Sequence, residues 1–360
     1  CCNVVQEENK LHIHLKDLAE TIEIEIIFSI SPSGVLCSQI SLLALEDGVQ
    51  IQNIASMLPI PEPLHFMQHF GGSWARELMS FKQEIPKACF SLENYRGRGS
   101  HQHFPGLLLS NHQNSAASQY VMGLHLAWSG NFEITTDHFQ PGYKTISAGE
   151  GLVEGELVLN DGQSYLSPEL LVAISTQGEN GIRAQFHEHA RTIYSEIRAA
   201  RPHFNTWEAC YFEQSADSLE LRAQLANELG IRRIMIDDGW FENRNSDQSG
   251  LGSYSIDLKK YPGGFKQIRE ILEKYELELG VWVEPEMLSP DVAQNYPSNW
   301  ILKNPHCDAK LARNQLAWDL SNPEVYQHIF NGLSQMLSDS QCSSIKWDMN
   351  RDRYQAIDQS

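Results

Sequence analysis

The sequence lacks long apolar runs. None of its hydrophobic stretches approaches the roughly 18 consecutive residues of a membrane-spanning helix. The start of the chain shows no secretory signal pattern. We therefore expect no membrane partner. The chain does not begin with Met, so we expect its natural N-terminus to lie upstream.

Cysteine is scarce and poorly spaced for a structural role. Seven cysteines occur in 360 residues, an odd number, and none forms a C-x-x-C pair. This excludes a disulfide framework and a cysteine-built zinc site, and it suits a reducing compartment, so we expect a cytoplasmic protein. His101 and His103 would share one face of a strand, but no third ligand accompanies them. We expect no metal and no cofactor.

Positive charge is also in short supply. The 27 Lys and Arg residues face 46 Asp and Glu residues, which gives a formal net charge of −19. This balance argues against a nucleic acid partner and leaves a neutral substrate such as a sugar open. Hydrophobic residues make up 41%, enough for a core in each of about two domains.

Residues 1 to about 180 carry the period-two alternation of strands with one buried face. Leu11–Lys16 reads L-H-I-H-L-K, and Thr21–Ile30 reads T-I-E-I-E-I-I-F-S-I. Turn-forming Ser-Pro-Ser-Gly at 31–34 and Asn-Asp-Gly at 160–162 separate such runs. Strand after strand with turns between them predicts a β-sandwich.

A different rhythm follows a helical segment at 181–200. Strand patterns at 204–212, 231–236, 279–284 and 343–348 alternate with helical patterns at 215–229, 265–276 and 323–338, the last opened by Ser321 as a cap. Such alternation predicts parallel strands joined by right-handed crossovers. The stretch from 201 to 360 is too short for a (β/α)₈ barrel of about 250 residues but suits half of one. On rhythm alone, a complete doubly wound sheet is the alternative.

Polar residues cluster where the last three of these strands end, the rim at which parallel α/β folds bind ligands. On the last strand Lys346, Asp348 and Asn350 share one face. A Lys beside a carboxylate favours the ionised form that a nucleophile needs. The alternative is that Lys346 and Asp348 form a purely structural ion pair at the rim of the barrel. Six of the eight tryptophans also follow residue 200, a composition typical of sugar sites, although core packing can explain any single one.

Nine short motifs occur in a characteristic order. The β-rich part contains H-F-G-G-S-W-A-R-E (69–77), R-G-R-G-S-H-Q-H-F-P (96–105) and W-S-G-N-F (128–132). The second part contains N-T-W-E-A-C-Y-F (205–212), D-D-G-W-F (237–241), E-P-E-M-L-S-P-D (284–291), R-N-Q-L (313–316), D-L-S-N-P-E-V (319–325) and K-W-D-M-N-R (346–351). Together they resemble the melibiase-type α-galactosidases of glycoside hydrolase clan D, in the larger multidomain family that includes bacterial raffinose-degrading enzymes.

The resemblance implies an N-terminal β-supersandwich, a (β/α)₈ TIM barrel and a C-terminal β domain. We therefore expect the β-supersandwich at 1–180 and the first half of the barrel, truncated after its fourth strand, at 201–360. The helical pattern at 181–200 predicts a linking helix between them. The resemblance implies that Asp348 is the nucleophile. It also implies substrate-binding roles for the residues that match the family's sugar contacts, namely Asp237, Asp238, Lys346, Asn350, Arg313, Trp207 and Trp300. We expect Lys346 and Arg313 to compensate the buried carboxylates. The chain departs from the family at 252–254, where Gly-Ser-Tyr replaces the usual Gly-Asp-Trp.

The function that the resemblance implies is a retaining glycoside hydrolase that removes terminal α-linked galactose from oligosaccharides such as raffinose or melibiose. The alternatives are a raffinose-synthase-like transglycosylase, an α-N-acetylgalactosaminidase, and a piece that binds sugar without catalysis. The family's general acid is an Asp after the sixth strand, which we expect beyond residue 360, so the chain alone should be inactive. We expect α-galactoside oligosaccharides as partners and leave a homo-oligomer open for the full-length protein.

Overall fold

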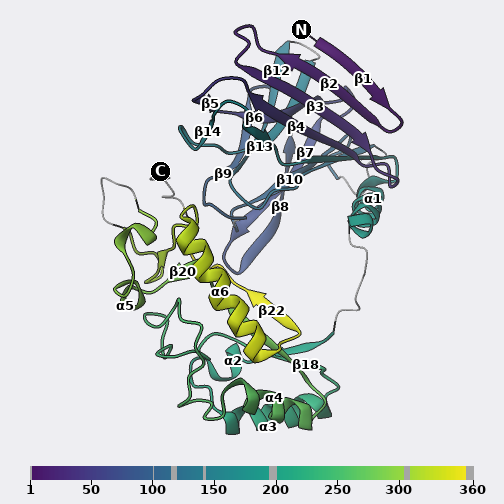
Figure 1. The fold of residues 1–360 in the computed structure, drawn as a ribbon. Coiled ribbons are helices and arrows are strands. Elements are labelled where there is room, and N and C mark those ends of the chain that lie inside the picture. Colours follow the sequence, from purple (N-terminus) through teal and green to yellow (C-terminus); the bar gives the residue numbers. More distant parts are fainter. Residues whose placement is uncertain are drawn as a thin grey trace. The chain divides into compact units, whose positions relative to one another are not determined.

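The chain forms two compact units, Cys1–Ile197 and Arg198–Ser360. The structure is a computed structural model that describes residues 2–99, 101–114, 120–140, 143–193, 201–303 and 309–353 (Figure 1). The first unit consists almost entirely of strands, and the second alternates strands with helices. A β-rich unit followed by an α/β unit agrees with the order expected from the sequence.

Two antiparallel sheets build the first unit. The larger one runs in the order β1 (Cys2–Glu7), β2 (Lys10–Lys16), β3 (Ile22–Ile30), β4 (Leu36–Ala44), β16 (Leu170–Ser175), β11 (Val121–Leu126), β10 (His103–Ser110), β7 (Phe66–Ser73) and β8 (Arg76–Glu84), with β15 (Ser164–Leu166) also paired to β4. The smaller one runs β6 (Ile54–Pro59), β13 (Tyr143–Glu150), β12 (Phe132–Gln140) and β9 (Phe90–Asn94). A short pair, β5 (Val49–Ile51) and β14 (Leu157–Leu159), forms a two-stranded sheet of its own.

The two sheets share one apolar core. Leu107 on β10 and Leu124 on β11 come from the larger sheet, and Phe132 on β12 and Ile146 on β13 come from the smaller one. All four side chains are at most 3% exposed. Because alternate residues of each strand enter this shared core, the period-two patterns of the sequence are the direct consequence of face-to-face sheet packing.

A helix, α1 (Gly178–Ile193), closes the first unit. It begins three residues before the predicted position and packs on β11 and β16. Gly123 on β11 permits this approach, since a Cβ there would lie 2.5 Å from a methyl carbon of Ile182. As far as residue 193, the segment predicted as a linker is therefore a packed part of the first unit. The remainder of the predicted linking helix, 194–200, lies outside the described residues.

The second unit is built on four parallel strands in the order β17 (His203–Asn205), β18 (Arg233–Ile236), β19 (Glu278–Val283) and β22 (Ser344–Trp347). The connections contain α2 (Trp207–Cys210), α3 (Ala216–Glu228), α4 (Gly264–Lys274), α5 (Pro290–Ala293), η2 (Ser298–Trp300) and α6 (Pro323–Ser340). A short antiparallel pair, β20 (Met287–Leu288) and β21 (Leu316–Ala317), follows β19. The predicted parallel pairing is confirmed.

Two local predictions for this unit are wrong. The strand predicted at 204–212 ends at Asn205, because the Asn205 side chain accepts a hydrogen bond from the N–H of Trp207 at 2.8 Å and turns the chain into α2. The cap of α6 is Asn322 rather than Ser321. The Asn322 side chain accepts the N–H of Glu324 at 2.9 Å, whereas the Ser321 hydroxyl donates to Asp319.

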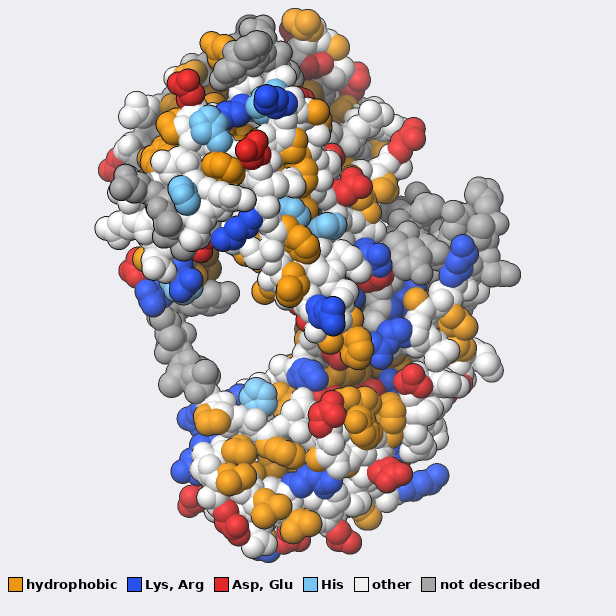
Figure 2. Space-filling view, turned by 180° about the vertical axis from the view of Figure 1, so that it is seen from behind, with side chains coloured by type: hydrophobic (Ala, Val, Ile, Leu, Met, Phe, Trp, Pro, Cys, Tyr) orange, Lys and Arg blue, Asp and Glu red, His pale blue; other side chains and the backbone are white. Residues whose placement is uncertain are grey.

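The surface of the second unit exposes several large hydrophobic side chains. Figure 2 shows patches of them between charged groups on this unit. On β22, Ile345 is 37% and Trp347 is 56% exposed. In the described ranges, no helix is long and apolar enough to cross a membrane.

Candidate active site

Polar side chains gather where β18 and β22 end. Asp237 directly follows β18 and is 3% exposed. One of its carboxylate oxygens accepts from Asn205 Nδ2 at 2.6 Å and from Lys346 Nζ at 2.7 Å, and the other accepts the N–H of Asp238 at 2.8 Å. The ion pair of Lys346 is thus with Asp237, which agrees with the expectation that Lys346 compensates a buried carboxylate. The lysine reaches from β22 across β19 to a strand two positions away.

Asp238 is compensated by an arginine that the sequence analysis did not single out. Arg244 Nε and Nη2 donate to the two Asp238 oxygens at 2.9 and 2.7 Å, a bidentate pair. Both residues are buried, Arg244 with 2% exposure. Burial raises the pKa of Asp238, and the guanidinium works against that rise. The only sequence signal was an arginine six residues after Asp238, on the loop that leaves the strand end.

The expected nucleophile, Asp348, directly follows β22 and is half-buried. Its N–H donates to Val283 O at 2.8 Å and extends the parallel ladder. Its Oδ2 accepts from Trp282 Nε1 at 3.0 Å and from Asn350 Nδ2 at 2.7 Å. Its Oδ1 accepts the N–H of the next residue, Met349, at 2.9 Å. Two side chains thus hold Oδ2, and the hydrogen bond to Oδ1 is local.

Glu284 and Glu286 follow β19 but have different surroundings. Glu284 is 4% exposed and accepts the N–H of Asn350 at 2.5 Å and Gln315 Nε2 at 3.0 Å. Burial raises the pKa of Glu284, the Asn350 N–H lowers it, and the nearby Asp348 raises it further. Glu286 is half-buried, accepts Trp347 Nε1 at 3.1 Å and pairs with Arg353 at 3.2 Å.

Three predicted sugar contacts lie outside this cluster of hydrogen bonds. Arg313 is exposed at the tip of a tight hairpin, in which it and Asn314 adopt positive φ angles of 51° and 58°. Trp207 is half-buried and meets Tyr211 edge to face, with ring centroids 5.1 Å apart. Trp300 packs in an aromatic group that contains Tyr296, Trp318 and His328.

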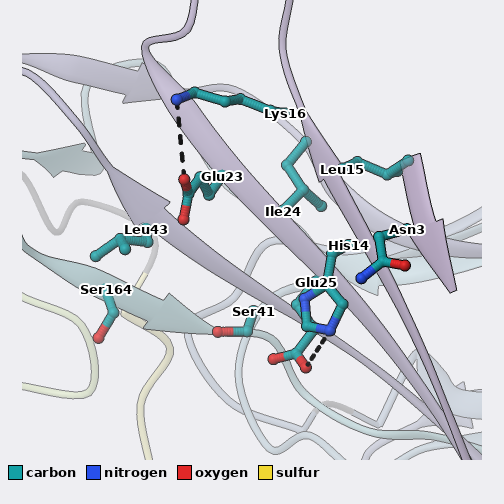
Figure 3. Close-up of a pocket in the computed structure, with 10 residues that line it drawn as sticks. All are labelled: Asn3, His14, Leu15, Lys16, Glu23, Ile24, Glu25, Ser41, Leu43 and Ser164. Carbon is teal, nitrogen blue, oxygen red and sulfur yellow. Dashed lines mark ion pairs between the residues drawn. The ribbon is translucent and has the colours of Figure 1, made fainter. Parts of the chain in front are cut away.

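Two of the pockets in the described residues lie away from these carboxylates. One, of about 490 Å³ in the first unit, is lined by β2, β3 and neighbouring strands, where Lys16 pairs with Glu23 at 3.9 Å and His14 with Glu25 at 3.7 Å (Figure 3). The other, of about 400 Å³ in the second unit, is lined in part by Gly252, Ser253 and Tyr254, the stretch that departs from the family pattern. Over the described ranges, no group of three or more His, Cys, Asp or Glu side chains could hold a metal.

Comparison with known proteins agrees with the order of the two units. The glycosyl hydrolase family 36 N-terminal domain matches residues 2–160, and the melibiase family matches residues 164–359. An α-galactosidase of Escherichia coli is 33% identical over 360 residues, which are 98% of this chain and 51% of that protein. The α-galactosidase AgaA of Geobacillus stearothermophilus is 29% identical over 96% of this chain and 49% of its own length.

Solved structures show the same correspondence. The crystal structure of AgaA from Geobacillus stearothermophilus has a TM-score of 0.89 at 28% identity, covering 96% of this chain and 49% of that one. The chain therefore spans about half the length of the curated relatives it matches. Since the melibiase match takes in residues 164–359, more than half of the sequence, this chain belongs to the melibiase family.

Proposed function

We propose that this chain is part of a retaining α-galactosidase with Asp348 as its nucleophile. The observation that carries the proposal is the position of Asp348 at the same strand-end rim as the ion pair between the buried Asp237 and the partly exposed Lys346. A carboxylate that is held by two side-chain donors can present its other oxygen to an electrophile. The neighbouring carboxylates are suited to accept hydrogen bonds from sugar hydroxyls.

In the proposed reaction, an oxygen of Asp348 attacks the anomeric carbon of a terminal galactose and forms an ester, while the bond from that carbon to the departing oxygen breaks. A general acid gives its proton to the departing oxygen. Water then hydrolyses the ester with the same acid residue acting as a base, so the anomeric configuration is retained. We assign hydroxyl binding to Asp237 and Asp238, and positioning of the reacting ring to Lys346 and Asn350.

The proposed substrates are α-galactoside oligosaccharides. Variants of the α-galactosidase AgaA have been crystallised in complex with raffinose and with stachyose, and the curated relatives are α-galactosidases. The contacts assigned to Trp207, Arg313 and Trp300 stay predictions from the family resemblance.

We also infer that the four parallel strands are the first four of a (β/α)₈ barrel. Strands in a sheet lie about 4.8 Å apart, so β18 and β22 are separated by roughly twice that distance. The ion pair between Lys346 and Asp237 across β19 is readily made if the sheet curls toward that face, as it does in a barrel. We propose that the general acid lies in a part of the longer protein outside this chain, since Glu284 and Glu286 are both occupied by donors.

The decisive experiment is covalent trapping in the complete protein. A fluorinated galactoside with a good leaving group forms the ester but releases it slowly, so mass spectrometry should find the label on the peptide that contains Asp348. NMR of the first product should show α-galactose. A label on Asp237, Asp238 or Glu286, or a β-configured first product, would refute the assignment.

A further inference from the structure

We propose that Glu284 is a positioning residue that holds the nucleophile Asp348 in place through Asn350. The proposal rests on the proposed function, because it concerns the same reaction. Glu284 accepts the backbone N–H of Asn350 at 2.5 Å, and the side chain of Asn350 donates to Asp348 Oδ2 at 2.7 Å. The buried carboxylate therefore fixes the backbone from which the nucleophile's own donor extends.

A second donor completes the hold on Asp348. Trp282 Nε1 reaches the same Oδ2 at 3.0 Å, and the indole is 1% exposed within the core of the second unit. With Trp282 fixed by packing and Asn350 fixed by Glu284, Oδ2 has two side-chain donors from independent elements. The orientation of the carboxylate is then set, and Oδ1 is the oxygen directed to the anomeric carbon.

Glu284 is itself held in place by a second hydrogen bond, from the side chain of Gln315. Its second oxygen accepts Gln315 Nε2 at 3.0 Å, and the backbone oxygen of Gln315 accepts Arg351 Nη1 at 2.6 Å. Gln315 is 3% exposed, and its Oε1 has no partner among the described residues. Both oxygens of Glu284 thus receive N–H donors, which suits an anchoring carboxylate.

The negative charge of Glu284 lies close to that of the nucleophile Asp348. Glu284 and Asp348 are neighbouring carboxylates, and besides burial the charge of Asp348 raises the pKa of Glu284. Replacing Glu284 by Gln would remove the charge of Glu284 and keep the shape. The new amide oxygen would accept the N–H of Asn350, and the new amide nitrogen would donate to Gln315 Oε1 after that amide rotates. Geometry and charge can therefore be varied separately.

The test uses the complete protein, an aryl α-galactoside with a good leaving group, and four variants. Glu284→Ala should lower kcat by about 10²-fold, the loss expected when a reacting group is misplaced by about 1 Å. Its inhibition by free galactose should weaken far less than kcat falls, because the hydroxyl-binding carboxylates remain. Glu284→Gln keeps the shape and can keep both hydrogen bonds, so it should retain most of kcat. Glu286→Ala and Glu286→Gln are matched controls two residues away, and both should retain kcat.

Several results would overturn the proposal. One is a Glu284→Ala enzyme with the kcat of the unmodified protein, and another is a loss of galactose binding as large as the loss of kcat. A folded Glu284→Gln enzyme that loses about as much kcat as expected for the alanine variant would also count against it, and this readout stands even if the alanine variant does not fold. Failure of the proposed function is separate, because it would appear in the unmodified protein as an absence of galactose release or as a label on another residue.

Discussion

Asp238 and Arg244 form an ion pair that is almost wholly removed from solvent. Removing the guanidinium would leave a buried charge without compensation, so Arg244→Ala should lower the free energy of unfolding by about 3–5 kcal/mol. Adding Asp238→Asn should recover part of this loss, because the remaining group is neutral. Urea unfolding of the complete protein, followed by tryptophan fluorescence, measures both effects.

A matched control is Lys274→Ala, which removes an ion pair with Glu220 on the surface of the same unit. Exposed pairs are screened by solvent and contribute little, so this variant should unfold much like the unmodified protein. Equal losses in Lys274→Ala and Arg244→Ala would contradict the importance given to burial.

The sequence predicted which carboxylates lie together at the strand ends better than it predicted their partners. Asp237, Asp238 and Asp348 follow apolar strand patterns, and because parallel strands end at one edge, their gathering there was predictable. The partner of Asp238 depends on how the loop from 239 to 244 folds back, a tertiary contact without periodicity. Lys346 was expected to share a face with Asp348 and to compensate a buried carboxylate. Its long side chain does reach the buried Asp237.

At the scale of single elements, the start of α6 offers a direct test of the observed cap. The Asn322 side chain accepts an otherwise unpaired N–H of the first helical turn. Asn322→Ala should therefore lower the free energy of unfolding by about 1 kcal/mol. Ser321→Ala is the comparison, since Ser321 contacts Asp319 and does not cap the helix. A larger loss in Ser321→Ala would support the cap expected from the sequence. Thermal denaturation of both variants decides between the two.

Strands β7 and β11 should make the first unit sensitive to acid. Burial lowers the pKa of His69 on β7 and of His125 on β11, so the folded state favours their neutral forms. The unfolded chain takes up protons near the ordinary value of 6.5. The stability that these groups contribute is therefore complete above that pH and is lost as the pH falls toward the lower folded pKa.

Hydrogen exchange of the β11 peptide Val121–Leu126 should show this loss as reduced protection below pH 6.5. His125→Gln should make the protection depend less on pH. The control is His187→Gln, which changes an exposed histidine on α1 and should leave the pH dependence as it is. A β11 peptide whose free energy of opening is the same on both sides of pH 6.5 would argue against buried neutral histidines.

Regular elements were predictable where one face is buried, and local exceptions were not. The patterns at 11–16 and 21–30 match β2 and β3 within one residue at each end, because the shared core imposes a period of two. The run at 204–212 has a strand composition but bends at Asn205, where one side-chain hydrogen bond to the backbone outweighs propensity. The segment at 181–200 had a helical pattern, but the sequence could not show that its first turns pack on Gly123.

At the scale of the whole molecule, the four-stranded parallel sheet has no further strand on either edge among the residues that the structure describes. β17 and β22 are its outer strands, and β22 exposes Ile345 and Trp347. Unpaired strand edges with apolar side chains favour association with another strand. Parallel sheets in proteins are normally covered on both faces, so these groups are suited to contact further β/α units of the proposed barrel.

The last prediction concerns the 360-residue chain by itself, which should release negligible galactose from raffinose. A general acid typically contributes about 10²–10⁴-fold to the rate, and raffinose needs one because its leaving group is a poor one. Glu284 and Glu286 cannot readily serve, since each is held by donors from the protein. An aryl galactoside with a good leaving group needs the acid less, so any residual activity should be found there and should vanish in Asp348→Asn. Galactose release by the chain and by the complete protein, measured on both substrates at equal concentration, gives the comparison. Efficient raffinose cleavage by the chain alone would mean that a carboxyl group within residues 1–360 acts as the acid. The proposal that the general acid lies outside this chain would then be wrong.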